Sequence, residues 1–143
     1  MRRLPVLDHT VPLLFYVIMV GSMYMLFAGH NQPGGGFVGG LVAGAAVSLR
    51  YIAGGIDEVR RLSPVRPWTI LGAGLIISAL TATIPLAFGD PVLEGGYRAF
   101  DLPVLGKVSI SSALVFDIGV YFCVVGLILM VFEAFGDRFE RER

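Results

Sequence analysis

The chain has 143 residues with 11 basic and 11 acidic side chains, so its formal net charge is zero. Hydrophobic residues make up 55% of it and charged residues only 15%, with a mean hydropathy of +0.77. These values exclude a water-soluble globular domain and a basic surface for nucleic acid, so the composition predicts a membrane protein embedded in a lipid bilayer.

Four long apolar runs predict four membrane-spanning helices, at about residues 10–28, 36–53, 68–88 and 111–135. The first and third runs contain no charged residue, the second contains Arg50, and the fourth contains Asp117 and Glu133. At about 1.5 Å per residue, each run is long enough to cross about 30 Å of hydrocarbon. The sequence predicts an all-α membrane protein that forms a single domain over residues 1–143.

The segments between these runs differ in basic residues. Both ends of the chain and the 54–67 segment hold most of them: Arg2, Arg3, Arg60, Arg61, Arg66, Arg138, Arg141 and Arg143. The 89–110 segment holds only Arg98 and Lys107. Because basic residues favour the cytoplasmic side, both termini are predicted to be cytoplasmic. Arg50 is then expected to extend to water at the inner end of its helix.

The first connection, GHNQPGGGFVGG at residues 29–40, is rich in glycine. Its 34–39 part satisfies the G-x-G-x-x-G fingerprint of dinucleotide-binding proteins. That fingerprint follows a strand in a parallel sheet, whereas this one follows an apolar helix, so we interpret the match as coincidental. The polar triplet His30, Asn31 and Gln32 has two open interpretations: solvated loop residues, or an entrance for protons or cations that uses the histidine.

The second predicted helix has a face with almost no side chains. Gly36, Gly40 and Gly44 recur every four residues, so another helix can approach this face closely, and we expect it to bind a neighbouring subunit. Pro33, Gly34 and Gly35 prevent a regular helix from starting earlier. Phe37 is the bulky exception, either a packing knob against a partner or a residue that fills lipid or core space.

The third and fourth predicted helices contain polar residues within the membrane. Pro85 frees the backbone carbonyl of Thr81 one turn back and therefore predicts a kink, and the hydroxyls of Thr81 and Thr83 can satisfy such freed groups. Asp117 lies about 9 Å inside the fourth helix, and its candidate partners are Tyr24 and His30. It is either a carrier of protons or sodium or a structural hydrogen-bonding group. We expect Glu133 to extend to water or to pair with Arg138, and the single Cys123 excludes an intrachain disulfide.

The motif GHNQPGGGF, followed by a helix of small residues, resembles the MnhB/MrpB family, the B-type subunits of multisubunit Mrp-type sodium/proton antiporters. The resemblance covers most of the chain. It implies a small accessory subunit in a bacterial plasma membrane, beside larger antiporter-like subunits that exchange Na⁺ for H⁺. Carried over to this chain, the motif falls on His30, Asn31, Gln32, Pro33, Gly34, Gly35, Gly36 and Phe37.

An alternative is an autonomous small channel or carrier that acts as a homo-oligomer. Against it, none of the apolar runs contains a lysine and only two acids lie in them, which is few for a complete ion path. A membrane enzyme would require a cluster of reactive side chains on one face, whereas His9 and His30 are predicted on opposite sides of the membrane. The sequence therefore predicts no enzymatic activity, no cofactor and no metal site.

Overall fold

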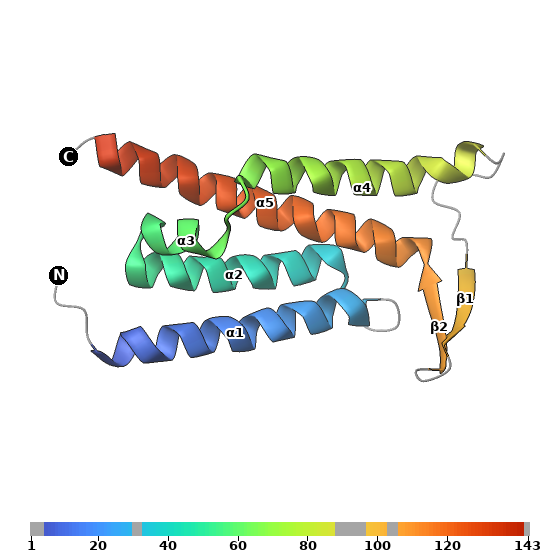
Figure 1. Cartoon of the computed structure of the whole chain (residues 1–143), viewed down its shortest axis with the longest axis horizontal. Helices are drawn as coiled ribbons and strands as arrows, with labels where there is room; N and C mark the ends of the chain where they lie inside the picture. The colour runs from blue at the N-terminus through green and yellow to red at the C-terminus, as the bar shows by residue number, and fades with distance from the viewer. Residues whose placement is uncertain (1–4, 30–32, 88–96, 103–105, 142–143) are drawn as a thin grey trace.

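The computed structural model describes residues 5–29, 33–87, 97–102 and 106–141 (Figure 1). In these segments the chain forms five helices and one hairpin. The helices are α1 (Pro5–Ala28), α2 (Gly36–Gly54), α3 (Ile56–Leu62), α4 (Pro67–Ala87) and α5 (Ser112–Arg141), and the strands are β1 (Tyr97–Leu102) and β2 (Gly106–Ser111).

Four of these helices are long and apolar enough to cross a membrane, over Thr10–Ala28, Gly36–Gly54, Pro67–Leu86 and Ser112–Gly136. The prediction of four spanning helices is therefore confirmed, with bounds within a few residues of those expected. Helix α3, which has seven residues, was not predicted from the sequence. Its first turn holds Asp57 and Glu58 and its last turn Arg60 and Arg61, an arrangement that matches the helix dipole.

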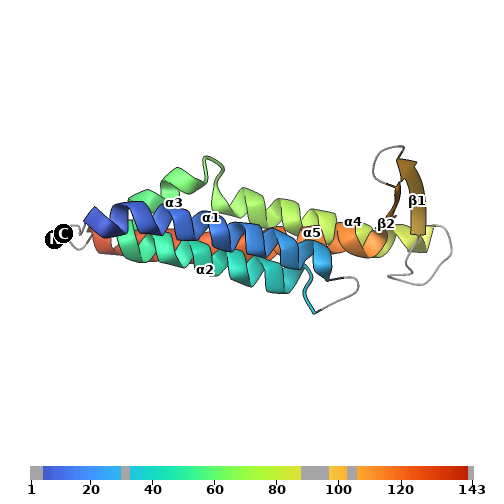
Figure 2. The same ribbon diagram turned by 90° about the horizontal axis from the view of Figure 1, so that it is seen from below.

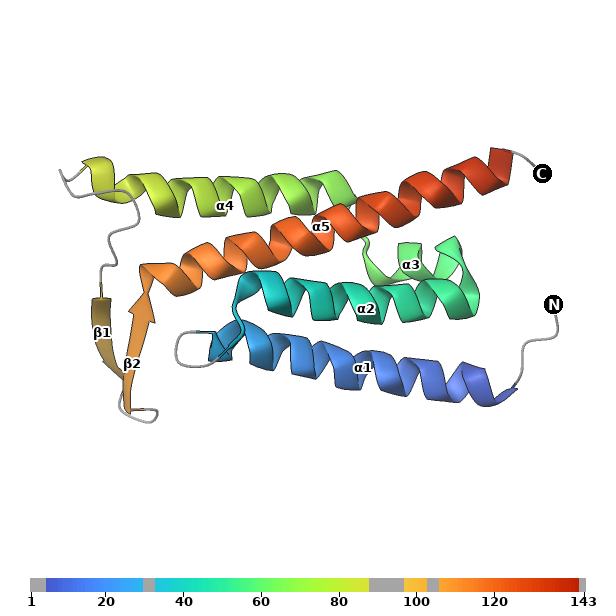
Figure 3. The same cartoon turned by 180° about the vertical axis from the view of Figure 1, so that it is seen from behind.

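The long helices lie in one row, in the order α1, α2, α5, α4 (Figures 1 and 3). Neighbours in this row pack against each other. Helix α5 lies between α2 and α4 and contacts both of them. Along the direction of the helix axes, the described ends of the chain and α3 lie at one end of the bundle, and the hairpin lies at the other (Figure 2). The first and last helices thus begin and end on the same side, as an even number of spans requires.

The hairpin is the part of the fold that the all-α prediction did not include. β1 and β2 pair antiparallel from Tyr97 opposite Ser111 to Leu102 opposite Gly106. In the sequence this region lies in the 89–110 segment, where neither a spanning helix nor a strand was predicted. Alternation of apolar and polar residues in KVSIS, residues 107–111, is the signal that could have predicted the second strand.

The buried core is small and lies between the middle helices. One cluster joins Leu26, Ala43 and Tyr121, and the other joins Val47, Val59 and Leu129. Many large apolar side chains instead point outward, above all on α1 and α4, as expected for helices that face lipid or neighbouring subunits. Close backbone packing is therefore what holds the row together.

The contact of α4 with α5 shows such packing, which was not predicted from the sequence. A Cβ on Gly74 of α4 would lie 2.6 Å from the backbone nitrogen of Cys123. On α5, a Cβ on Gly126 would lie 2.5 Å from the backbone nitrogen of Leu71. Both distances are too short for any side chain, so glycine is required on each side of this contact.

The threonines of α4 bond within their own helix. Thr81 donates its hydroxyl hydrogen to the carbonyl of Ile77 at 2.7 Å, and Thr83 donates to that of Ala79 at 2.8 Å. These acceptors lie four residues back, as is usual for threonine in a helix. Pro85 has no N–H, so the Thr81 carbonyl four residues earlier lacks its usual helical donor. The threonine hydroxyls bond other carbonyls and do not replace that donor.

Candidate functional site

The candidate site is the junction where α1 ends, α2 begins and α5 passes beside both. The chain turns back tightly here, because the Gly35 N–H donates to the carbonyl of Met25 at 2.9 Å. A Cβ on Gly34 would lie 2.5 Å from that same oxygen, and one on Gly29 would collide with the backbone of Gly35. Gly35 has a φ of 98°, which side chains rarely tolerate. The glycines of the motif are therefore needed to build this turn.

The glycine face of α2 packs inside the chain. A Cβ on Gly36 would collide with the Asp117 carbonyl oxygen, and one on Gly40 would lie 2.7 Å from the Cβ of Val124. Gly44 meets the Ile128 side chain in the same way, so all three glycines contact α5. The face that we expected to bind a neighbouring subunit is thus occupied by α5 of the same chain. Because the pattern marks only a close approach, it did not identify which helix approaches.

The other side of α2 contacts α1, although less closely than the glycine face contacts α5. A Cβ on Gly39 would lie 3.0 Å from the carbonyl oxygen of Ser22 and 3.2 Å from the nitrogen of Leu26. Phe37, in contrast, is 58% exposed and points away from the chain's own core. Of the two interpretations of Phe37, filling the core of this chain is therefore excluded, and contact with lipid or with a neighbouring subunit stays a prediction.

Asp117 lies against the start of α2. Its carboxylate oxygens are 3.2 and 3.5 Å from the position that a Cβ on Gly35 would occupy. Gly35 is the N-cap of α2 and has no side chain to bond the free N–H groups of the first turn. A negative charge at this position interacts favourably with the positive end of the α2 dipole. Among the described residues, no hydrogen bond or ion pair to the Asp117 side chain is present.

The structure does not show the other predicted ion-path residues, Tyr24 and His30, together with Asp117 as a site. Tyr24 is 60% exposed on α1 and takes part in an interaction of its own. His30, Asn31 and Gln32 lie outside the described residues, so their two interpretations stay open. The neighbour of Asp117 that the structure does describe is the α2 backbone, a partner that a search for charged or polar side chains overlooks.

A buried hydrogen-bond chain one turn deeper joins all three helices of the junction. Ser22 of α1, which is fully buried, donates its hydroxyl hydrogen to the carbonyl of Gly39 in α2 at 2.8 Å. Its oxygen lies 2.9 Å from the hydroxyl of Tyr121 in α5, which is 5% exposed. Since the Ser22 hydrogen is already donated, Tyr121 is the donor of the second bond. Sequence reasoning missed these bonds, although Ser22 is conspicuous as a polar residue in an apolar run.

We expect Tyr121→Phe to lower the free energy of unfolding by about 1 kcal/mol, because it removes one buried hydrogen bond. Ser22→Ala should cost more, about 1.5 kcal/mol, since it leaves two buried groups without their partner. Unfolding of the purified chain in mixed detergent micelles measures both. Tyr16→Phe is the matched control, because Tyr16 is 63% exposed, and it should change nothing. Equal stability of Tyr121→Phe and Tyr16→Phe would contradict this role of the hydrogen-bond chain.

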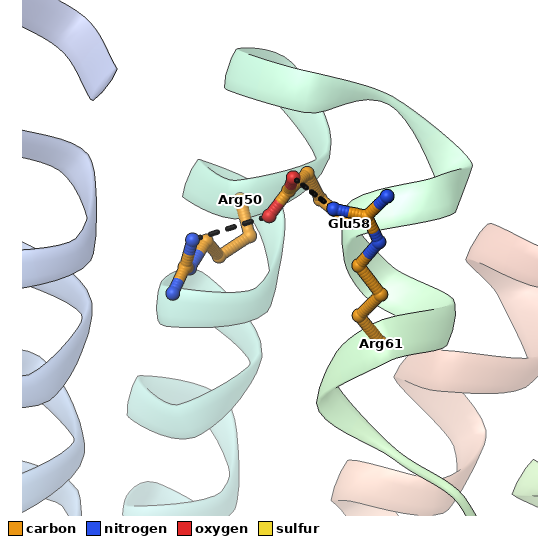
Figure 4. A network of polar contacts seen from close by, with 3 residues as sticks. All are labelled: Arg50, Glu58 and Arg61. Carbon is orange, nitrogen blue, oxygen red and sulfur yellow. Dashed lines mark hydrogen bonds and ion pairs between the residues drawn. The ribbon is translucent and has the colours of Figure 1, made fainter.

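The opposite end of α2 is held by an ion-pair network (Figure 4). Nη1 of Arg50 lies 3.2 Å from Oε2 of Glu58, and Nη1 of Arg61 lies 3.5 Å from the other carboxylate oxygen. The Arg50 guanidinium also lies 5.2 Å from the ring centroid of Phe15 in α1. Its side chain is only 16% exposed, and its buried Nε has no hydrogen-bond partner among the residues that the structure describes. The expectation that Arg50 extends to water is therefore wrong, because α3 covers it and provides Glu58.

Glu133 lies half-buried on α5, at the wall of a pocket beside α3. The side chain of Arg138, its predicted partner, lies outside the described part, so that pairing stays a prediction. Cys123 is a free thiol that faces α4, 3.9 Å from the carbonyl of Leu71. Among the described side chains there is no group of three or more histidine, cysteine, aspartate or glutamate residues that could hold a metal ion.

Comparison with known proteins connects this arrangement to a family. The family model described as a domain related to the MnhB subunit of Na⁺/H⁺ antiporter matches residues 6–130. The B-type subunit of a Na⁺/H⁺ antiporter from Bacillus subtilis is 38% identical over 132 residues, which cover 92% of each chain. "Putative antiporter subunit mnhB2" of Staphylococcus aureus is 36% identical over 126 residues, which cover 88% of this chain and 89% of the relative.

A solved structure shows the same fold. The structure of the Mrp complex from Dietzia sp. DQ12-45-1b contains a chain that superposes with a TM-score of 0.77 and 30% sequence identity. The match covers 92% of this chain but only 14% of that one, so the fold described here recurs as a small part of a much longer polypeptide. The family match over most of the chain, together with relatives of near-equal length, shows that this chain belongs to the MnhB family.

Proposed function

We propose that this chain is the B-type subunit of a multisubunit Na⁺/H⁺ antiporter in a bacterial plasma membrane. The observation that supports this most directly is the match over 92% of both this chain and the B-type antiporter subunit of Bacillus subtilis. The superposition on part of the Mrp complex supports membrane subunits as partners. We propose an accessory, non-enzymatic role in assembly of the complex, in which other subunits provide the transport path.

The interior of the bundle supports an accessory role over an autonomous carrier. The buried hydroxyls of Ser22 and Tyr121 already bond each other and the Gly39 carbonyl, so they form a closed hydrogen-bond chain. Asp117 is the single acid deep in the described spans, since Glu133 lies near the end of the spanning part of α5, which ends at Gly136. We therefore assign Asp117 to holding the start of α2 through its charge. One acid with a structural role is too little for a path across the membrane.

The surface left for neighbouring subunits follows from the internal packing. Because α5 and α1 cover the glycine faces of α2, we propose that partners contact the outward sides of α1 and α4. These sides expose large apolar residues, such as Val20 at 70% and Ile76 at 61%. Both termini are proposed to be cytoplasmic, since the end of the bundle where α1 begins and α5 ends also holds Arg60, Arg61 and Arg66.

Na⁺-dependent proton exchange in inverted membrane vesicles tests the proposal. We compare vesicles with the complete set of antiporter subunits, the same set without this chain, and this chain alone. Exchange is expected only with the complete set, and returning the chain on a plasmid should restore it. Exchange by this chain alone would show an autonomous carrier and overturn the proposal. Full exchange without the chain would show that it is dispensable.

A further inference from the structure

Helix α3 lies over the seam between α2 and α5 (Figure 1). Of its seven residues only Val59 is buried, in a cluster with Val47 of α2 and Leu129 of α5. A pocket of about 120 Å³ opens beside α3, lined by Ile56 and Val59 together with Glu133 of α5, so the packing on this side is incomplete. A helix of this length is not stable by itself, and one with so little buried surface is held more weakly than the long helices around it.

An ion pair ties α3 to α2 (Figure 4). Oε2 of Glu58 lies 3.2 Å from Nη1 of Arg50, and both side chains are largely buried. Gly54 leaves room for this pair, because a Cβ there would collide with the Glu58 side chain. Arg61 contacts the other oxygen of the same carboxylate, but it lies on α3 itself and is 77% exposed, so that contact does not hold α3 to another helix. The Glu58–Arg50 pair is therefore a charged contact that must break before α3 can leave α2.

Both flanks of α3 are suited to a hinge. Gly55 lies between α2 and α3 and has a φ of 76°, a value that side chains rarely adopt. Nothing lies within 4 Å of an added Cβ at Gly55, so its surroundings leave it space to move. Ser63, which follows α3, is already extended, with a φ of −126° and a ψ of 108°. Changes of the backbone angles at such element ends can move α3 without unwinding α2.

The closed position of α3 has a cost as well as a gain. Burial of Val59 and the pair of Glu58 with Arg50 favour it. Against it, the Arg50 Nε is buried with no hydrogen-bond partner in the part of the chain that the structure describes, and water reaches this group once α3 moves away. Opposing contributions of similar size leave a minor state populated at about 0.1–10%. We propose that α3 is a flap that opens about Gly55, and that the Glu58–Arg50 ion pair holds it closed.

Opening of the flap changes what surrounds Arg50, the basic residue within the described spans. In the closed state its guanidinium faces a carboxylate, and in the open state it faces water. Opening also uncovers Val47 and Leu129, the apolar residues of the seam that Val59 covers. The flap thus controls access to one end of the contact between α2 and α5. This device goes beyond the proposed accessory role and does not depend on transport, so a failed exchange assay would leave it standing.

Hydrogen–deuterium exchange of the purified full-length chain in detergent micelles, read by mass spectrometry, tests the flap. The amides of Arg60, Arg61 and Leu62 are those that bond within α3. We expect them to exchange at least about tenfold faster than the amides of residues 43–50 in α2, because α3 opens while α2 stays folded. Equal rates in the two segments would mean that α3 opens only when the whole chain unfolds, which would overturn the proposal.

Variants test the ion pair and the hinge. Glu58→Gln should speed exchange in α3 about tenfold, the equivalent of about 1.4 kcal/mol, because it leaves Arg50 without its carboxylate. Gly55→Ala should also speed it, since the closed state needs a φ that alanine rarely adopts. Arg61→Gln is the matched control, because it removes only the exposed contact with Glu58, and it should change exchange by less than about twofold. Equal rates in Glu58→Gln and Arg61→Gln would contradict the role of the ion pair.

Thiol labelling with N-ethylmaleimide separates opening of the flap from fraying of α3 in place. Val59→Cys places a thiol on the side of α3 that is buried in the closed state, and the native Cys123, which faces α4, is the internal reference. Adding Glu58→Gln to Val59→Cys should raise labelling at residue 59 about tenfold, with no change at Cys123. A similar rise at both thiols would show that the whole chain loosens. No rise at residue 59 would show that α3 stays in place, and either result would rule out the flap.

Discussion

A chain with Gly36→Ala is expected to lose about 3 kcal/mol of unfolding free energy, although the change adds only one methyl group. Helix propensity alone gives the opposite sign, since alanine stabilises a helix by up to about 1 kcal/mol relative to glycine. At this position, however, the new Cβ would collide with the Asp117 carbonyl oxygen. A backbone atom in the middle of a helix cannot rotate away, so α2 and α5 must separate.

Gly21→Ala and Gly72→Ala are matched controls for this prediction. Both glycines lie inside long helices, and nothing lies within 4 Å of an added Cβ at either one. Both variants should be as stable as the parent chain or slightly more stable. Denaturant titration in detergent micelles compares the three, and native gels of the whole complex show whether Gly36→Ala still assembles. A Gly36→Ala chain as stable as Gly21→Ala would mean that α2 does not approach α5 so closely.

Asp117→Lys is expected to cost about 3 kcal/mol, because it replaces a favourable interaction with the α2 dipole by a repulsive one of similar size. The dipole interaction reaches about 2 kcal/mol in partly buried positions, and this carboxylate lies beside the N-cap that has no side chain. Asp117→Asn should cost about 1 kcal/mol or less, roughly half of that dipole interaction, since the amide keeps the shape and its partly negative oxygen still faces the start of α2. The same titration measures both changes.

Transport by the complete complex then separates the two interpretations of Asp117. If the residue holds α2, Asp117→Asn leaves both the complex and its Na⁺/H⁺ exchange largely intact, while Asp117→Lys releases the chain from the complex. If the residue carries protons or sodium, Asp117→Asn abolishes exchange in a complex that is still fully assembled. The second pattern would contradict the structural role that we assign to this side chain.

Some features of this protein follow from one-dimensional signals. The positions of the four spans are determined by hydropathy summed over about 20 residues, a property that does not depend on which helices become neighbours. The turn at Pro33, Gly34 and Gly35 is likewise local, because proline and glycine limit the backbone directly. The same reasoning missed α3 and the hairpin, which are too short or too polar to produce a strong signal.

The chain's sequence alone therefore determined the family, the four spanning helices and the start of the second one after Pro33, Gly34 and Gly35. Only the tertiary structure decided that α5 covers Gly36, Gly40 and Gly44, that Ser22 bonds Tyr121, and that Glu58 pairs with Arg50. The physical reason is that lipid tails are as apolar as the helices themselves, so hydrophobicity places each helix in the membrane without choosing its neighbour. That choice depends on close backbone contacts and on a few buried polar groups, whose partners are distant in the sequence.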